Sequence, residues 1–158
     1  MKKIILVVAL FFMFTASRAQ KKPNLLVFFV DDLGWADLGY RNPEFNTPNM
    51  DKLKEEGMEF TRAYVATPTC SPSRASLLTG KEPVRLEMPR HITDEDPNSG
   101  TEKYNFWPAD PVQMPSINYL PLEEITYAER LKEFGYYNMF IGKWHLGFGP
   151  DFCPNDRG

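Results

Sequence analysis

The fold is indicated most clearly by residues 125–147, which read ITYAERLKEFGYYNMFIGKWHLG. Thr126, followed three residues later by Glu129, forms a capping-box pattern at the start of a helix, and Gly135 is placed to end that helix. Residues 136–141 are aromatic and apolar, and they predict a strand that turns at the next glycine. A helix that leads directly into a strand is a building unit of α/β architecture.

The same alternation of strand and helix occurs earlier in the chain. Residues 24–30, NLLVFFV, form a continuous apolar run that predicts a strand buried on both faces, as in a parallel sheet. A helix is predicted to begin at Thr47–Pro48 and to end at Gly57, and residues 58–65 predict a second strand. Another helix follows from about 72 to 78. The predicted fold class is α/β, with a mostly parallel central sheet flanked by helices.

Residues 1–19 have the pattern of a secretory signal peptide. Lys2 and Lys3 precede an apolar run, residues 4–14, and the small residues within 17–19 fit a cleavage site. The run is shorter than the roughly 18–20 apolar residues that span a bilayer. We therefore expect an exported protein, periplasmic or secreted, with no membrane span after cleavage. The alternative is an uncleaved N-terminal anchor.

The chain that remains after cleavage is acidic and contains a long irregular stretch. It has 15 basic against 21 acidic residues, a net charge of −6, which does not favour nucleic-acid binding. Residues 81–121 are rich in proline and polar residues, and such a stretch is long for one small domain. We therefore expect residues 20–158 to be the N-terminal part of a larger, truncated domain.

Two of the predicted strands end in polar residues, at the edge where open α/β sheets bind their ligands. Asp31 and Asp32 follow the first strand, and adjacent carboxylates suit a hard cation such as calcium or magnesium; an ordinary Asp-rich turn is the alternative. Lys143 and His145 follow the last strand and, in extended backbone, would point the same way. They would bring a cation and a proton-transfer group into one pocket, or be a solvated lysine and a hydrogen-bonded histidine. The other histidine, His91, is given no role.

Residues 70–80, CSPSRASLLTG, place a cysteine at the start of a predicted helix. Backbone N–H groups and the helix dipole favour an anion there, and Arg74 lies one turn on, on the same face. The pair suits a tetrahedral oxyanion such as sulfate or phosphate, and a thiolate at Cys70 would also be an activated nucleophile. The alternative is a disulfide between Cys70 and Cys153, the two cysteines of the sequence.

At these residues the sequence resembles the sulfatase family. Residues 70–74, CSPSR, match the family's C-x-P-S-R signature, and residues 78–80, LTG, complete its longer form. Further matches follow the family's order: PNLLVFFVDDLGWADLG at 23–39, NTPNMDKLKEEGMEFTRAY at 46–64, GKWHLG at 142–147, and the closing PNDRG. The resemblance implies an alkaline-phosphatase-like α/β fold, of which residues 20–158 would be the N-terminal part of the catalytic domain.

The resemblance implies that Cys70 is chemically modified. In this family the signature cysteine is oxidised during export to Cα-formylglycine by a formylglycine-generating enzyme. One hydroxyl of the hydrated aldehyde attacks the sulfur of a sulfate ester, and the other later expels sulfate. Residue 70 would thus be both the nucleophile and a ligand of a calcium ion. The implied substrate is a sulfated carbohydrate or an aryl sulfate.

The resemblance also implies roles for the other candidate residues. Asp31 and Asp32 would be calcium ligands. Arg74 would stabilise the diol and the transferring charge, and Lys143 would bind sulfate oxygens. His145 would hold and deprotonate a diol hydroxyl. The rival interpretations are a phosphoesterase of the wider alkaline-phosphatase-like group, a secreted non-catalytic binding module, and an inactive remnant.

The family completes its metal site and its leaving-group contacts with residues later in the chain, and no residue here matches them. We therefore predict that these 158 residues alone neither bind calcium tightly nor turn over sulfate esters. Isothermal titration calorimetry with calcium tests this, and tight binding by the isolated chain would contradict it.

Overall fold

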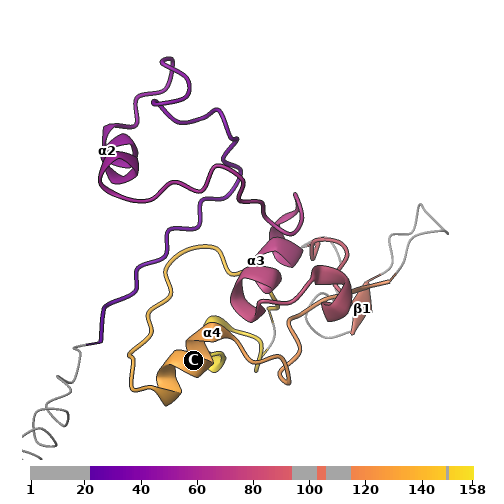
Figure 1. The fold of residues 1–158 in the computed structure, drawn as a ribbon. Coiled ribbons are helices and arrows are strands. Elements are labelled where there is room, and N and C mark those ends of the chain that lie inside the picture. The colour runs from indigo at the N-terminus through magenta and orange to yellow at the C-terminus, as the bar shows by residue number, and fades with distance from the viewer. Residues whose placement is uncertain (1–21, 94–102, 106–114, 149) are drawn as a thin grey trace, which may run out of the picture. The chain divides into compact units, whose positions relative to one another are not determined.

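Figure 1 shows the computed structural model of the protein, which describes residues 22–93, 103–105, 115–148 and 150–158. The chain divides into two units, Met1–Trp35 and Ala36–Gly158, and each is described by itself. The predicted signal peptide lies outside the described residues, so its cleavage stays a prediction. No helix among the described residues has the length and apolar character needed to cross a membrane.

The second unit contains the helices and strands of the described chain. In sequence order they are α2 (Pro48–Glu56), α3 (Cys70–Thr79), the 3-10 helix η1 (Pro83–Leu86), β1 (Tyr104–Asn105), β2 (Ser116–Ile117), α4 (Tyr127–Glu133) and the 3-10 helix η2 (Pro154–Asp156). β1 and β2 pair antiparallel, with Tyr104 opposite Ile117 and Asn105 opposite Ser116.

The three α-helices of the described residues form where the sequence predicts them, because their end signals are local. α2 follows Thr47 and ends at Gly57, although Gly57 takes an extended φ of −113° rather than a left-handed one. α3 begins at Cys70, two residues earlier than expected, and ends at Gly80. The φ of Gly80 is 70°, and its N–H donates to the carbonyl of Ser76 at 2.8 Å. This is the left-handed helix end that glycine adopts without a steric cost.

The predicted parallel sheet is absent from the described residues. Residues 24–30, 58–65 and 136–141 take no strand conformation, and most of their apolar side chains are exposed. Leu26 is 78 % exposed and Ile141 is 86 % exposed. A strand exists only where a neighbour shares its backbone hydrogen bonds, and the described chain supplies no such neighbour to these segments. The sheet that is described, between β1 and β2, is short and antiparallel.

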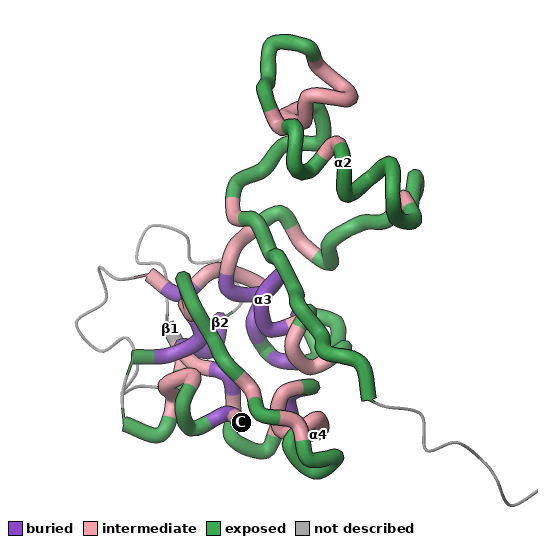
Figure 2. Tube along the Cα trace, turned by 90° about the vertical axis from the view of Figure 1, so that its left-hand side faces the viewer, coloured by how far each residue is buried: buried purple, intermediate pink, exposed green. Residues whose placement is uncertain are grey.

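The described core of the second unit is built around α3. Ala75 of α3 belongs to a cluster of buried apolar side chains, together with Leu86, Met88, Ile92, Ile117, Leu120 and Leu146. α3 packs against η1 and against α4. Figure 2 shows buried residues along α3 and β2, whereas α2 has none. The core therefore joins segments that lie far apart in the sequence to the buried face of one helix.

Polar contacts organise the residues around α2. Thr47 Oγ1 accepts from the N–H of Gly39 at 2.7 Å and donates to Asp51 Oδ1 at 2.8 Å. The position of Thr47 before Pro48 suggests a helix cap, but its side chain makes no hydrogen bond to the helix backbone. The Arg41 guanidinium donates to Glu59 Oε1 at 2.5 Å. This hydrogen bond, more than the charge of Arg41, holds the pKa of the Glu59 carboxyl below its ordinary value.

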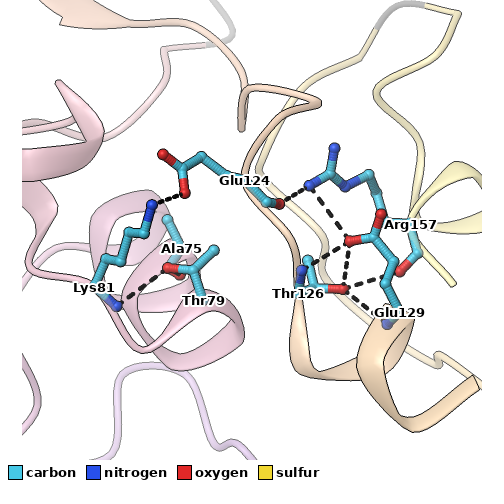
Figure 3. A network of polar contacts seen from close by, with 7 residues as sticks. All are labelled: Ala75, Thr79, Lys81, Glu124, Thr126, Glu129 and Arg157. Atoms are coloured by element: carbon cyan, nitrogen blue, oxygen red, sulfur yellow. Dashed lines mark hydrogen bonds and ion pairs between the residues drawn. The ribbon is translucent and has the colours of Figure 1, made fainter. Parts of the chain in front are cut away.

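A second polar network ties the last residues of the chain to the start of α4 (Figure 3). The hydroxyl of Thr126 accepts from the N–H of Glu129 at 3.2 Å and lies 3.1 Å from the carbonyl oxygen of Arg157. Glu129 Oε2 accepts from the N–H of Thr126 at 2.8 Å, which completes the predicted capping box. The Arg157 guanidinium donates to the carbonyl of Glu124, whose carboxylate pairs with Lys81 beyond the end of α3.

We expect Thr126→Ala to lower the free energy of unfolding by about 2 kcal/mol, because it removes a helix cap and the hydroxyl that lies against a buried carbonyl. Thr126 is 1 % exposed, so water does not replace the lost contacts. Urea unfolding followed by circular dichroism measures the change. Thr126→Ser keeps the hydroxyl and is the matched control; equal loss in both variants would show that the methyl group, and not the cap, is responsible.

Candidate active site

Cys70 is the first residue of α3, at the edge of the buried part of the second unit. The cysteine is half-buried, and residues 71–75, which follow it, are all buried. Thr69 precedes the helix in extended backbone, with φ −104° and ψ 151°, and makes no side-chain cap. Cys70 and Cys153, both among the described residues, are not joined by a disulfide bond. The structure therefore does not support the disulfide-stapled alternative.

Arg74 connects the first turn of α3 to the segment GKWHLG. Its side chain is buried, with only 8 % of the residue exposed, and its Nη1 donates to the backbone carbonyl of Lys143 at 2.6 Å. A hydrogen bond from a charged donor in a buried setting is among the stronger kinds. The sequence predicts that Arg74 contacts an oxyanion, and this stays a prediction. The structure shows that the guanidinium of Arg74 binds the backbone of Lys143, another candidate residue.

The backbone of Ile92 connects Ser71 with His145. The N–H of Ile92 donates to Ser71 Oγ at 3.0 Å, and the carbonyl of Ile92 accepts from His145 Nε2 at 2.7 Å. Ser71 is fully buried and Ile92 is 1 % exposed. The residue directly after Cys70 is thus joined to the predicted proton-transfer histidine through the backbone N–H and carbonyl of a single residue, Ile92.

The backbone of GKWHLG differs from the extended form that the sequence argument assumed. His145 has a φ of 57°, in the left-handed region, so the alternation that would place Lys143 and His145 on one side does not continue through it. Lys143 is exposed, and Trp144 donates from Nε1 to the carbonyl of Phe152 at 2.7 Å. Gly147, with φ 127°, has no room for a Cβ, which would lie 2.6 Å from the Cβ of Phe152.

Asp31 and Asp32 belong to the first unit and lie in a turn. Asp32 has a φ of 55°, which aspartate tolerates better than most residues. The two adjacent carboxylates offer the oxygen donors that calcium prefers. The thiol of Cys70 is a soft sulfur donor and does not fit calcium, whereas an oxygen-bearing oxidation product at that position does. Since calcium takes about six to eight oxygen ligands, the carboxylates of this pair are a fitting but partial set.

Sequence reasoning missed Ser71 and Ile92. Ser71 occupies the variable position of the C-x-P-S-R pattern, and Ile92 contributes only backbone atoms, so neither carries a signal in the sequence. His91 was given no role, yet its ring centroid lies 6.5 Å from that of His145. Tertiary contacts alone bring these residues beside the predicted site.

Comparison with known proteins assigns the family. The family model described as Sulfatase matches residues 23–157, and the chain belongs to that family. It is 40 % identical over 144 residues to N-acetylgalactosamine-6-sulfatase of Canis lupus familiaris, covering 90 % of the chain and 25 % of the relative. It is 41 % identical over 141 residues to arylsulfatase A of Homo sapiens, covering 87 % and 24 %. The chain thus spans about a quarter of the length of these curated relatives.

The chain also resembles a solved structure in its fold. The crystal structure of Ps i-CgsB matches with a TM-score of 0.64 and 32 % sequence identity, over 81 % of this chain and 24 % of the other. Family and structural likeness together imply the alkaline-phosphatase-like α/β fold, as the sequence predicts. The mostly parallel central sheet stays a prediction, because the sheet of the described residues has only the two strands β1 and β2.

We expect Arg74→Lys to lower the free energy of unfolding by about 1.5–3 kcal/mol, the usual contribution of a hydrogen bond to a charged group. An ammonium on a flexible stem cannot reproduce the planar guanidinium that reaches the carbonyl of Lys143. Thermal unfolding measures the loss. Arg85→Lys, at an exposed position in η1, is the control and should leave stability unchanged. Equal behaviour of the two variants would contradict a structural role for Arg74.

Proposed function

We propose that the chain is the N-terminal part of a longer enzyme, a sulfatase that hydrolyses sulfate esters through a formylglycine formed from Cys70 and a bound calcium ion. One observation carries the proposal: the C-x-P-S-R signature forms the buried first turn of α3 and is hydrogen-bonded to GKWHLG through Arg74 and the backbone of Lys143. Two stretches that resemble the family therefore meet at Arg74, and Cys70, at the start of the same helix, is half-buried. The family assignment supports the same reaction class.

In this proposal, some residues of the chain bind the sulfate group and another transfers a proton. Arg74 is hydrogen-bonded to the backbone of Lys143, and the positive charges of these two residues would favour a sulfate group although the chain is acidic overall. His145 would take the proton of a diol hydroxyl of residue 70. The buried backbone contacts of Ser71 and Arg74 keep these groups in place, so that little reorganisation is needed during reaction.

Formylglycine and calcium supply what unmodified side chains lack. The hydrated aldehyde offers one hydroxyl as nucleophile and a second whose deprotonation releases sulfate. Asp31 and Asp32 would hold the calcium ion, which neutralises charge and favours the ionised hydroxyl. The thiol of Cys70 would have to be oxidised first by a formylglycine-generating enzyme, since a thiol has no second hydroxyl to release the sulfate and is a poor ligand for calcium.

A sulfated carbohydrate or an aryl sulfate is the proposed substrate class. The relatives named above are called N-acetylgalactosamine-6-sulfatase and arylsulfatase A, and the solved relative Ps i-CgsB was also crystallised in complex with k-i-k-neocarrahexaose. We place the enzyme in the periplasm or outside the cell, because residues 1–19 match a signal peptide.

Mass spectrometry of the tryptic peptide 63–74, from protein made in its host, tests the modification. We expect residue 70 as an aldehyde that a hydrazine reagent traps as a hydrazone. We also expect Cys70→Ala, made in the longer enzyme, to lower the hydrolysis of para-nitrophenyl sulfate by about 1,000-fold or more, because it removes the nucleophile.

Two results would count against the proposal. An unmodified thiol at Cys70, or a disulfide to Cys153, would show that the signature is not used and would favour the inactive remnant. Faster hydrolysis of para-nitrophenyl phosphate than of the sulfate would favour the related phosphoesterase. Cys153→Ala is the matched control and should leave sulfate hydrolysis unchanged, since Cys153 lies outside the signature.

A further inference from the structure

Ser71 stands in the signature position that the family pattern leaves variable, yet it has a defined partner. Its hydroxyl oxygen accepts the N–H of Ile92 at 3.0 Å, and neither residue has appreciable contact with water. A buried backbone N–H needs an acceptor, and water cannot take that part here. The hydroxyl of Ser71 therefore fixes where the peptide of Ile92 lies relative to the start of α3.

The other end of the same residue holds His145. The carbonyl oxygen of Ile92 lies 2.7 Å from His145 Nε2. A carbonyl can only accept, so Nε2 must carry a hydrogen. In the neutral imidazole the lone pair is then on Nδ1, and Nδ1 is the nitrogen that can take up a proton. The position of Ile92 thus selects the tautomer of His145.

The backbone of His145 is in an unusual conformation that its surroundings must maintain. Its φ of 57° lies in a region that non-glycine residues adopt only when their surroundings hold them there. The adjacent Leu146 is fully buried, and its carbonyl accepts from the N–H of Leu120 at 2.9 Å. The backbone beside His145 is therefore held by the buried Leu146, and the ring of His145 is held by the carbonyl of Ile92.

We propose that Ser71 is a positioning residue that acts on His145 through the backbone of Ile92. It keeps the imidazole oriented and protonated on Nε2, so that Nδ1 is available for proton transfer. This inference rests on the proposed function for its kinetic consequence, but the geometry and the tautomer are measurable without any substrate.

Nitrogen NMR of ¹⁵N-histidine-labelled protein at a pH where His145 is neutral reads the tautomer directly. His145→Gln identifies the signals of His145 by their loss. In the wild-type protein we expect a protonated Nε2 and an unprotonated Nδ1. In Ser71→Ala we expect the two nitrogen signals of His145 to move towards each other, because the ring exchanges between tautomers. A wild-type ring protonated on Nδ1 would overturn the inference, even if Ser71→Ala does not fold.

Kinetics of the longer enzyme with para-nitrophenyl sulfate give the second readout. We expect Ser71→Ala to lower kcat by about 10- to 100-fold, part of what a proton-transfer group contributes, with KM within about twofold. Ser71→Thr keeps the hydroxyl and should restore kcat and the tautomer. Mass spectrometry of residue 70 must show equal modification in each variant, so that kcat reports on His145.

Ser116→Ala is the matched control. Ser116 is also fully buried, and its hydroxyl accepts from the N–H of Arg90 at 3.3 Å and donates to the carbonyl of Arg90 at 3.1 Å. This variant should lose a similar amount of thermal stability and keep the tautomer of His145. If His145 exchanges between tautomers in both serine variants, the effect comes from general destabilisation of the fold. That result would overturn the specific role of Ser71.

The inference and the proposed function can fail separately. If the longer wild-type enzyme hydrolyses no sulfate ester, the proposed function fails, while the tautomer of His145 in Ser71→Ala still decides the inference. If the wild-type protein is an active sulfatase and Ser71→Ala leaves both kcat and the nitrogen signals unchanged, the inference fails and the proposed function stands.

Discussion

The first turn of α3 is the constraint on which the described structure of the second unit depends. It is buried, and two of its polar side chains bind backbone groups of distant segments, Ser71 that of Ile92 and Arg74 that of Lys143. A third hydrogen bond, from His145 to the carbonyl of Ile92, joins those two segments to each other. Buried polar groups without partners cost free energy, so each of these bonds excludes alternative placements of the chain. The core cluster around Ala75 forms on the same helix.

Three apolar segments lie outside this core, and their exposed side chains do not stabilise the described structure. Segments 24–30, 58–65 and 136–141 expose side chains such as Leu26 and Ile141. Apolar surface left in water contributes nothing to folding, and extended backbone without neighbours must bond to solvent. The chain spans about a quarter of the length of its curated relatives. The sheet that the sequence predicts therefore needs strands that the described residues do not provide.

Helices were predictable because their signals lie within a few residues of one another. The capping pair Thr126 and Glu129 and the left-handed Gly80 act within single turns and need no distant partner. The antiparallel pairing of β1 with β2 carried no comparable signal, since register depends on which segments meet. The left-handed backbone of His145 was missed for the same reason, because the residue type only tolerates what its surroundings impose.

The sequence by itself determined the chemical types at the site: a cysteine before a helix, an arginine one turn on, adjacent carboxylates, and a lysine and histidine in one short segment. It also determined the family, because a signature is a property of order along the chain. Only the tertiary structure decided that Arg74 binds the backbone of Lys143 and that Ser71 reaches His145 through Ile92. These contacts join residues separated by tens of positions, and no local propensity encodes them; they follow from the burial of α3 and the need to pair every polar group buried with it.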